Sequence, residues 1–317
     1  MPTNRGAFKI FSLAGIGVYV HWSWFLVAIY FIQFRTHEYS SMIWNVLEYL
    51  SLFGIVLTHE FGHQLACRSV GGKTHDIILW PLGGVAYVSP PQRPGAQLWS
   101  IAAGPLVNVV LVPVLYVFLL SLGGHWSLYA DQPDEYAEFL NNICFINIGL
   151  LIFNMMPVYP LDGGQILRSL LWFVVGRANS LMIASVIGFI GVAGLIGLAL
   201  FLFFIPGGQQ NAIWIGIMAA FILMNCWGGL RQARALARIA KLPRREGFAC
   251  PSCKTAPPLG ALWRCGKCGQ AFDTFLTQGV CPHCGTQFSV TQCLDCGTSS
   301  PIAEWRSSAE GGVRSAE

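Results

Sequence analysis

Long apolar stretches that carry almost no charge constrain the fold of this chain more than any other feature. A membrane helix needs roughly 20 consecutive apolar residues to cross the hydrocarbon core. Only 11% of the 317 residues are charged, against about 25% in soluble domains. Six stretches approach the required length: 12–33, 47–67, 98–122, 139–157, 180–205 and 211–230. We therefore expect an all-α membrane protein, a bundle of six transmembrane helices.

The segment 74–91, THDIILWPLGGVAYVSPP, does not fit that pattern. It is too short to span a bilayer and is broken by glycine and proline. Irregular backbone at membrane depth is tolerated only where protein covers it. We predict a short β hairpin packed beside the second span.

Loop charges predict the orientation of the bundle, because cytosolic loops of membrane proteins are enriched in lysine and arginine. If the N-terminus is cytosolic, every basic residue between the spans except Arg35 falls on the cytosolic side. The predicted outer loop 123–138 has four acidic residues and no basic one. Both termini are thus expected in the cytosol. Composition and the lack of an organelle-targeting segment favour a prokaryotic plasma membrane.

His59-Glu60-Phe61-Gly62-His63 is an H-E-x-x-H motif within the second predicted span. Residues four apart share one helix face, so both imidazoles can bind one zinc ion. Glu60 can then take a proton from the water that the zinc activates. Ionisable residues in an apolar span are costly, which favours a functional role over a structural one.

A catalytic zinc ion needs a third protein ligand, and Asp162 is the candidate. It is the only acidic residue between Glu138 and Glu246. Prolines and glycines surround it in NMMPVYPLDGG (154–164), so the helix should break there and let the carboxylate turn towards another span. Spans two and four both run inwards, which places His59, His63 and Asp162 at similar depth.

The two motifs together resemble the site-2 protease family of intramembrane zinc metalloproteases. Three further stretches are similar to that family: GIGVYVHWSW (15–24), PLGG (81–84) and AGPLVN (103–108). The resemblance covers about residues 8–230. It implies peptide-bond hydrolysis in transmembrane protein substrates, with zinc on His59, His63 and Asp162 and with Glu60 as the base. It also implies that Asn154 contacts substrate or stabilises the tetrahedral intermediate.

The resemblance further implies that the 81–84 hairpin helps to hold an extended substrate strand. Residues 77–88 would then offer an edge to which the substrate adds. An equally weighted alternative is a hairpin that only seals the zinc cavity. Many relatives have arginine directly after D-G-G, whereas this chain has Gln165, and it lacks the regulatory domains that many of them carry.

Eight of the eleven cysteines form four Cys-x-x-Cys knuckles after residue 249. Two knuckles complete one closed tetrahedral site, so the eight thiolates predict two structural zinc ribbons in a reducing compartment. Pairing of successive knuckles keeps each loop short, and we favour it over a cross-braced arrangement. The predicted ligands are Cys250, Cys253, Cys265 and Cys268 for one site, and Cys281, Cys284, Cys293 and Cys296 for the other.

Four segments follow from these patterns. Residues 1–230 form the six-span protease domain, 231–249 a basic juxtamembrane linker, 250–300 the ribbons and 301–317 a disordered tail. The linker's arginines suit either an ordinary cytosolic flank or a helix on anionic lipid. From residue 250 onwards basic and acidic residues are equal in number, so nucleic acid is not an expected partner. A protein partner of the ribbons is favoured by elimination.

The sequence therefore predicts a zinc-dependent intramembrane endopeptidase with one catalytic and two structural zinc ions, embedded in lipid. The alternative is a non-catalytic zinc-binding membrane scaffold or a transporter. Glu60 separates the two, since neither alternative needs a carboxylate between the histidines. The substrate, its cleavage site and the activating signal are not encoded in any recognisable pattern.

Overall fold

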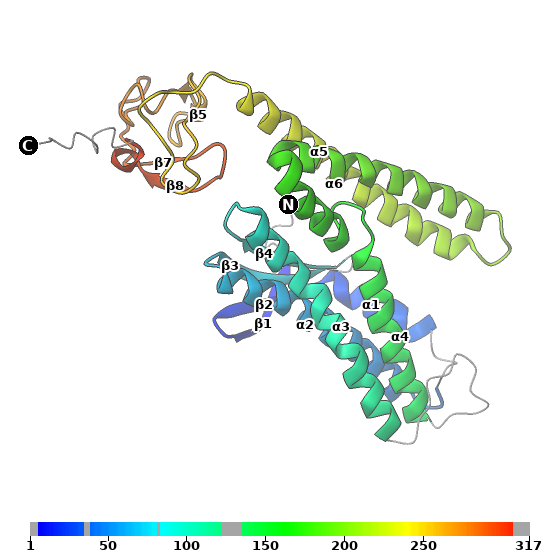
Figure 1. The fold of residues 1–317 in the computed structure, drawn as a ribbon. Coiled ribbons are helices and arrows are strands. Elements are labelled where there is room, and N and C mark those ends of the chain that lie inside the picture. Colours follow the sequence, from blue (N-terminus) through cyan, green and yellow to red (C-terminus); the bar gives the residue numbers. More distant parts are fainter. Residues whose placement is uncertain (1–5, 35–38, 81–82, 122–134, 307–317) are drawn as a thin grey trace, which may run out of the picture.

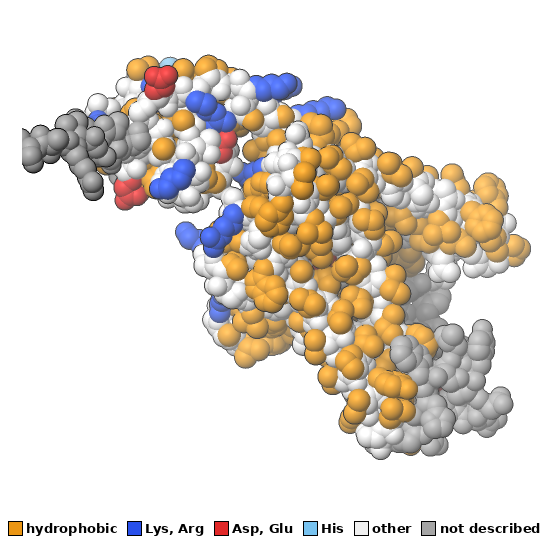
Figure 2. All heavy atoms as spheres, viewed as in Figure 1, with side chains coloured by type: hydrophobic (Ala, Val, Ile, Leu, Met, Phe, Trp, Pro, Cys, Tyr) orange, Lys and Arg blue, Asp and Glu red, His pale blue; other side chains and the backbone are white. Residues whose placement is uncertain are grey.

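The computed structural model describes residues 6–34, 39–80, 83–121 and 135–306 (Figure 1). Within those ranges five helices are long and apolar enough to cross a membrane. Large apolar side chains point outwards along them, and Figure 2 shows the helical part largely covered by hydrophobic atoms, a surface that suits lipid. The five are α2 (Met42–Ser69), α3 (Pro94–Ser121), α4 (Glu135–Met155), α5 (Asp162–Phe203) and α6 (Gln209–Ala240).

The prediction of a first span over residues 12–33 is wrong for the first half of its length. Strands β1 (Ala7–Leu13) and β2 (Ile16–His21) occupy its first part, and α1 (Ser23–Phe34) follows with only 12 residues. A two-residue turn joins the strands with positive φ at Ala14 and Gly15 (52° and 74°), the geometry of a tight hairpin. The structure thus has six helices but only five of membrane-spanning length in its described part.

The hairpin predicted at 74–91 is confirmed and belongs to a larger sheet. Strands β3 (Lys73–Trp80) and β4 (Gly83–Ser89) pair antiparallel, and the sheet order is β1-β2-β3-β4. Strand β2 runs parallel to β3, and the helical segment between them supplies the crossover that parallel neighbours need. Ile16, Val18, Ile77 and Leu79 are fully buried against α2. Strand β4 is therefore left at one edge of the sheet.

Helices α2, α3 and α4 lie side by side, and α3 also packs against α5 (Figure 1). The connection 156–161 between α4 and α5 is anchored by Val158, which packs with Val192 of α5 and Ile222 of α6. Helix α5 bends sharply at Gly176, whose φ of 79° and ψ of 171° are accessible essentially only to glycine. Beyond the bend, α5 runs alongside α6.

The predicted outer loop lies mostly outside the described residues, as do Arg35, Asp131 and Asp134. Its last part is helical, because α4 begins at Glu135. The Glu135 carboxylate accepts hydrogen bonds from the Ser40 N–H (2.6 Å) and the Trp44 indole (2.8 Å). These contacts tie the start of α4 to the start of α2.

The C-terminal part contains two small sheets. They pair β5 (Trp263–Arg264) with β6 (Ala271–Phe272), and β7 (Val290–Gln292) with β8 (Ser299–Pro301). The prediction that disorder begins at 301 is wrong for its first six residues, since a 3-10 helix (Ile302–Trp305) follows β8 and buries Trp305 against Phe275. Residues 307–317 lie outside the described part.

Candidate metal centre

His59, His63 and Asp162 converge in the interior between α2 and the start of α5, as the sequence predicts. The Nε2 atoms of the two histidines are 3.1 Å apart. Asp162 Oδ2 lies 3.0 Å from His59 Nε2 and 3.4 Å from His63 Nε2. Both imidazoles are buried, and Asp162 is largely covered. Residues from two helices, about a hundred positions apart, thus place three ligand atoms around one point.

Hydrogen bonds on the far side of each ring fix where its proton lies. His63 Nδ1 is 2.9 Å from the carbonyl oxygen of Ser100, which can only accept, so Nδ1 carries the proton. His59 Nδ1 is 2.6 Å from Asn108 Oδ1 and donates to it. With both protons on Nδ1, each Nε2 presents a lone pair to the centre.

The Asn108 amide is itself oriented by a second amide. Asn147 Nδ2 donates to the backbone carbonyl of Asn108 (3.0 Å), which leaves Asn147 Oδ1 to accept from Asn108 Nδ2 (2.7 Å). The Asn108 oxygen must then face His59. All three side chains are buried. The chain from Asn147 to Asn108 to His59 therefore sets the tautomer of the first histidine.

The donor set and its spacing fit a tetrahedral zinc ion. Two ligand atoms at about 2.0–2.1 Å from zinc are roughly 3.3 Å apart at the tetrahedral angle, close to the three separations above. Asp162 Oδ2 is buried without a hydrogen-bond donor among the described residues. Two lone pairs and a carboxylate oxygen facing one another repel unless a cation lies between them. His59, His63 and Asp162 could together hold such a cation and leave one position open.

Close helix packing brings the third helix up to this point. A Cβ atom at Gly104 of α3 would overlap the His63 ring and lie 2.8 Å from His59 Nε2. Glycine is the residue that leaves room for the backbone to approach the histidines this closely. Similarly, a side chain at Gly163 would collide with the carbonyl of Met155, so the D-G-G motif lets α5 begin directly against the end of α4.

Glu60 is buried on the same turn of α2 as His59. Asn154 is partly buried near the end of α4, and no hydrogen bond among the described residues links it to the three converging side chains. Sequence reasoning did not assign roles to Asn108, Asn147 or the Ser100 carbonyl. An asparagine within an apolar span was the available signal, since amides there need partners.

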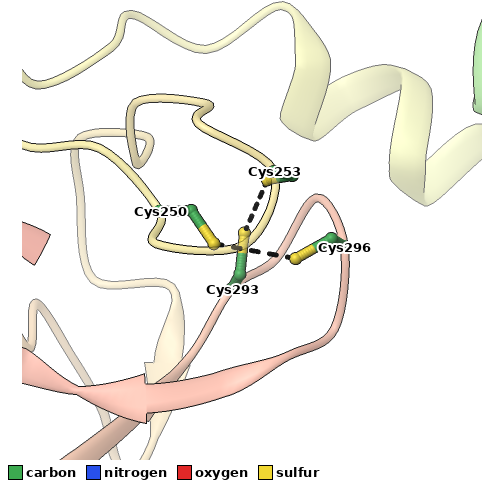
Figure 3. Close-up of side chains that lie close together, drawn as sticks. All are labelled: Cys250, Cys253, Cys293 and Cys296. Carbon is green, nitrogen blue, oxygen red and sulfur yellow. Dashed lines mark hydrogen bonds between the residues drawn. The ribbon is translucent and has the colours of Figure 1, made fainter. Parts of the chain in front are cut away.

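The cysteine knuckles form two clusters, but not in the predicted pairing. The first knuckle meets the fourth in an outer cluster, Cys250, Cys253, Cys293 and Cys296, and the second meets the third in an inner cluster, Cys265, Cys268, Cys281 and Cys284. Figure 3 shows the outer cluster, with its sulfur atoms turned towards one another. The favoured sequential pairing is therefore wrong, and so is the cross-braced alternative. The arrangement is nested.

Sulfur separations in both clusters fit tetrahedral zinc. Cys250 and Cys296 are 3.7 Å apart, and Cys253 and Cys293 are 3.8 Å apart. The matching separations in the inner cluster are 3.6 and 3.7 Å. Zn–S bonds of about 2.3 Å give a tetrahedral edge of roughly 3.8 Å. A hydrogen bond from the Thr286 hydroxyl lowers the pKa of Cys284 to about 6, which favours the thiolate that zinc binds.

Comparison with known proteins agrees with the motifs. The model of Peptidase family M50 matches residues 48–138 and 121–198. A Synechocystis sp. protein named as a candidate zinc metalloprotease, sll0528, is 30% identical over 71% of this chain and 60% of its own length. Zinc metalloprotease MJ0392 of Methanocaldococcus jannaschii is 32% identical over 57% of this chain and 50% of its own length. The chain thus spans about half the length of the curated relatives it matches.

Among solved structures, a site-2 protease from Methanocaldococcus jannaschii aligns with 71% of this chain and 95% of its own, at 27% identity and a TM-score of 0.49. The family assignment rests on the family model and the curated relatives. Together with the five apolar helices, they show an integral membrane protein. The chain carries a Peptidase family M50 domain over residues 48–198, the site-2 protease family that its paired motifs resemble.

Proposed function

We propose that the chain is a zinc-dependent endopeptidase that hydrolyses peptide bonds in or near the transmembrane segments of membrane-tethered proteins. The observation that carries the proposal is the convergence of His59, His63 and Asp162 within 4.8 Å of one another in an apolar helical domain. Glu60, on the same helix turn as the first histidine, supplies the carboxylate that a zinc-binding scaffold or transporter would not need.

Zinc bound by these three ligands would supply a Lewis acid that activates water and polarises the scissile carbonyl. The chain's own groups do the rest. Glu60 takes the proton from the attacking water and passes it to the departing amide nitrogen. Asn108 and the Ser100 carbonyl keep each Nδ1 protonated, so that both Nε2 atoms stay available as ligands. Asn154, near the end of α4, is our candidate for a substrate or intermediate contact.

The edge strand β4 is the proposed docking site for the substrate. A peptide bond in a membrane helix is shielded by its own backbone, so the substrate must unwind before hydrolysis. Addition to an open sheet edge replaces the helical hydrogen bonds that unwinding breaks. Strand β4 is the last strand of its sheet and packs on α2, the helix that carries His59 and His63. That position supports substrate docking beside the metal centre.

The same proposal extends to the rest of the chain. One zinc ion would be catalytic, and two would be structural, each closed by four cysteines. The protease domain would occupy residues 1–230, with a basic linker and the ribbons on the cytosolic side of a prokaryotic plasma membrane. The arginines of 231–245 support that orientation. The ribbons would bind protein, with membrane lipid around the helices.

Replacement of Glu60 by glutamine tests the proposal. The purified chain, reconstituted in lipid, is incubated with single-span model proteins, and products are located by mass spectrometry. We expect cleavage within or beside the span by the unmodified chain and a loss of more than about a hundredfold in Glu60→Gln. Zinc content should stay the same, because the ligands are untouched. Equal cleavage by the two chains would reject the proposal. Cleavage by neither chain would also reject it and would favour a scaffold or transporter.

A further inference from the structure

A polar cavity of about 230 Å³ lies where the end of β4 meets the start of α3, the first half of α5 and the C-terminal half of α6. Its volume is below the roughly 300–1,000 Å³ typical of small-molecule sites and suits one or two side chains. Figure 2 shows Lys and Arg side chains gathered where the C-terminal part meets the helical part. The polar lining is Ser89, Gln97, Gln165, Arg168, Arg177 and Gln232.

Arg168 is the unusual member of this lining. Its Nε is buried without a hydrogen-bond partner, and none of the ion pairs among the described residues includes it. Its guanidinium lies 6.0 Å from the centre of the Trp172 ring, which is its aromatic neighbour. A partly buried cation without an anion is costly, so its position is best explained by a ligand that brings the negative charge.

Arg177 adds a second cation to the same cavity. Its guanidinium lies 5.7 Å from the same Trp172 ring, so one indole positions both arginines. One terminal nitrogen donates to the carbonyl oxygen of Asp295, while Nε is buried without a partner. Two guanidinium groups with free donors, flanked by glutamine amides, match the acceptor geometry of a carboxylate.

The cavity lies at the end of strand β4, where an extended substrate added to that strand would reach it. Its wall includes Val88 and Ser89, the last residues of β4. Arg168 follows Asp162 by six residues on α5, which is about 9 Å along the helix axis. A strand added to β4 would therefore leave the sheet edge at this cavity, close to the metal ligands.

We propose that this cavity is a specificity subsite that binds the carboxylate of an acidic residue flanking the cleaved segment of the substrate. The assignment rests on the proposed protease function and names a substrate class, membrane proteins with an aspartate or glutamate on the cytosolic flank of the span. Arg168 provides the main charge, and Arg177 and the glutamines complete the hydrogen bonds. A neutral flank leaves Arg168 buried and unpaired.

Binding to the inactive full-length chain tests the subsite without hydrolysis. The probes are fluorescent single-span peptides in which one glutamate is moved through the first eight cytosolic flank positions, each with a glutamine twin. They are titrated against Glu60→Gln in phosphatidylcholine nanodiscs. We expect one or two positions at which the glutamate peptide binds about tenfold or more tightly than its twin, as charged hydrogen bonds allow. No preference at any position would overturn the proposal.

Variants then test whether Arg168 causes the preference for the glutamate peptide over its glutamine twin. Arg168→Gln, made in the Glu60→Gln chain, should abolish the tenfold difference while leaving the glutamine peptide's affinity unchanged, which also shows that the fold is intact. Arg168→Lys keeps the charge and should retain part of the preference. Arg234→Gln, at an exposed arginine of α6, makes the same charge change outside the cavity and should retain all of it. A full preference in Arg168→Gln would assign the carboxylate to another site.

A lipid phosphate could present similar chemistry, and a second arm separates it from a substrate carboxylate. The titrations are repeated in nanodiscs with phosphatidylglycerol. If this lipid raises the affinity of both peptides equally, and Arg168→Gln removes the rise, the cavity holds a lipid headgroup and the proposal is wrong. These titrations measure binding and not hydrolysis. If the Glu60→Gln cleavage test rejected the proposed function, the preference for glutamate peptides would still be tested independently.

Discussion

At the residue scale, hydrogen-bond acceptors behind the two histidines hold the proton of each imidazole on Nδ1. A histidine binds zinc through one nitrogen only if the proton is held on the other. His63 uses a backbone carbonyl for this, which no substitution at that position can remove. His59 depends on the side chain of Asn108, and that side chain is held by Asn147. The first histidine is therefore the ligand that mutation can perturb indirectly.

Asn108→Leu should weaken zinc at the His59 site without touching a ligand. Leucine has a similar size but accepts no hydrogen bond, so the imidazole loses its fixed tautomer. We expect zinc affinity to fall about 10- to 100-fold, the usual cost of removing such a partner. The measurement is competition with a chelator on the purified chain, with loss of one zinc equivalent followed by mass spectrometry.

Asn225→Leu is the matched control. Asn225 is partly buried on α6, and its amide donates to the carbonyl of Phe221, four residues back on the same helix. Its replacement should leave all zinc equivalents in place. If Asn108→Leu retained zinc as tightly as the control, the orientation of His59 would have another origin.

At the scale of elements, the nested pairing of the knuckles makes a prediction that separates it from the sequential one. Cys250 and Cys265 belong to different clusters in the structure, whereas the sequential pairing would place them in one. Cys250→Ser with Cys265→Ser should therefore cost two zinc equivalents. Cys250→Ser with Cys296→Ser should cost one, because both serines fall in the outer cluster. The reverse pattern in native mass spectra would restore the sequential pairing.

The nested arrangement could not be predicted from the sequence because loop length is a weak guide to which knuckles share a zinc site. Loop-closure entropy grows only slowly with length, so a long outer loop costs little more than a short one. Contacts that join the ends of the C-terminal part decide the pairing instead. The Ala249 N–H donates to the Trp305 carbonyl (2.7 Å), and Phe248 bridges to Arg306. Neither contact leaves a mark in the Cys-x-x-Cys spacing.

Periodicity explains why the prediction of a first span over residues 12–33 failed. Residues 12–33 are apolar enough to resemble a span, but Ile16, Val18 and Val20 alternate as buried strand residues, and Gly15 supplies a hairpin turn. Apolar content alone cannot separate the two. By contrast, H-E-x-x-H and D-G-G predicted that His59, His63 and Asp162 converge, because helix geometry and the break before α5 follow directly from those residues. Asn108 was missed since its role depends on which helix lies opposite His59.

On the scale of the whole molecule, Asp295 joins the C-terminal part to the helical domain. Its carboxylate forms a two-point ion pair with Arg244, at 2.6 Å to one oxygen and 3.0 Å to the other. Its carbonyl oxygen accepts a hydrogen bond from Arg177, directly after the bend of α5. The fourth knuckle, which contains Asp295, is thus connected to both α5 and the segment after α6. An outer zinc site that fixes this knuckle also fixes Arg177, one wall of the proposed subsite.

Asp295→Asn should loosen that connection without changing the cysteine ligands. The asparagine keeps the size and one acceptor but loses the charge, and the pair is partly exposed, so we expect a cost of about 1 kcal/mol. That corresponds to roughly a fivefold rise in the population of an open state. Trypsin cleavage after Lys241 and Arg244, timed by mass spectrometry, measures it.

Glu304→Gln, at an exposed carboxylate on the 3-10 helix of the same C-terminal part, makes the same charge change away from α5 and should leave trypsin cleavage unchanged. Equal cleavage rates in the two variants would mean that Asp295 does not restrain the linker. A faster rate confined to Asp295→Asn, accompanied by a smaller preference for glutamate peptides, would connect the ribbons to the subsite through Arg177. The C-terminal zinc sites would then influence which substrates the membrane domain accepts, although they lie outside its catalytic centre.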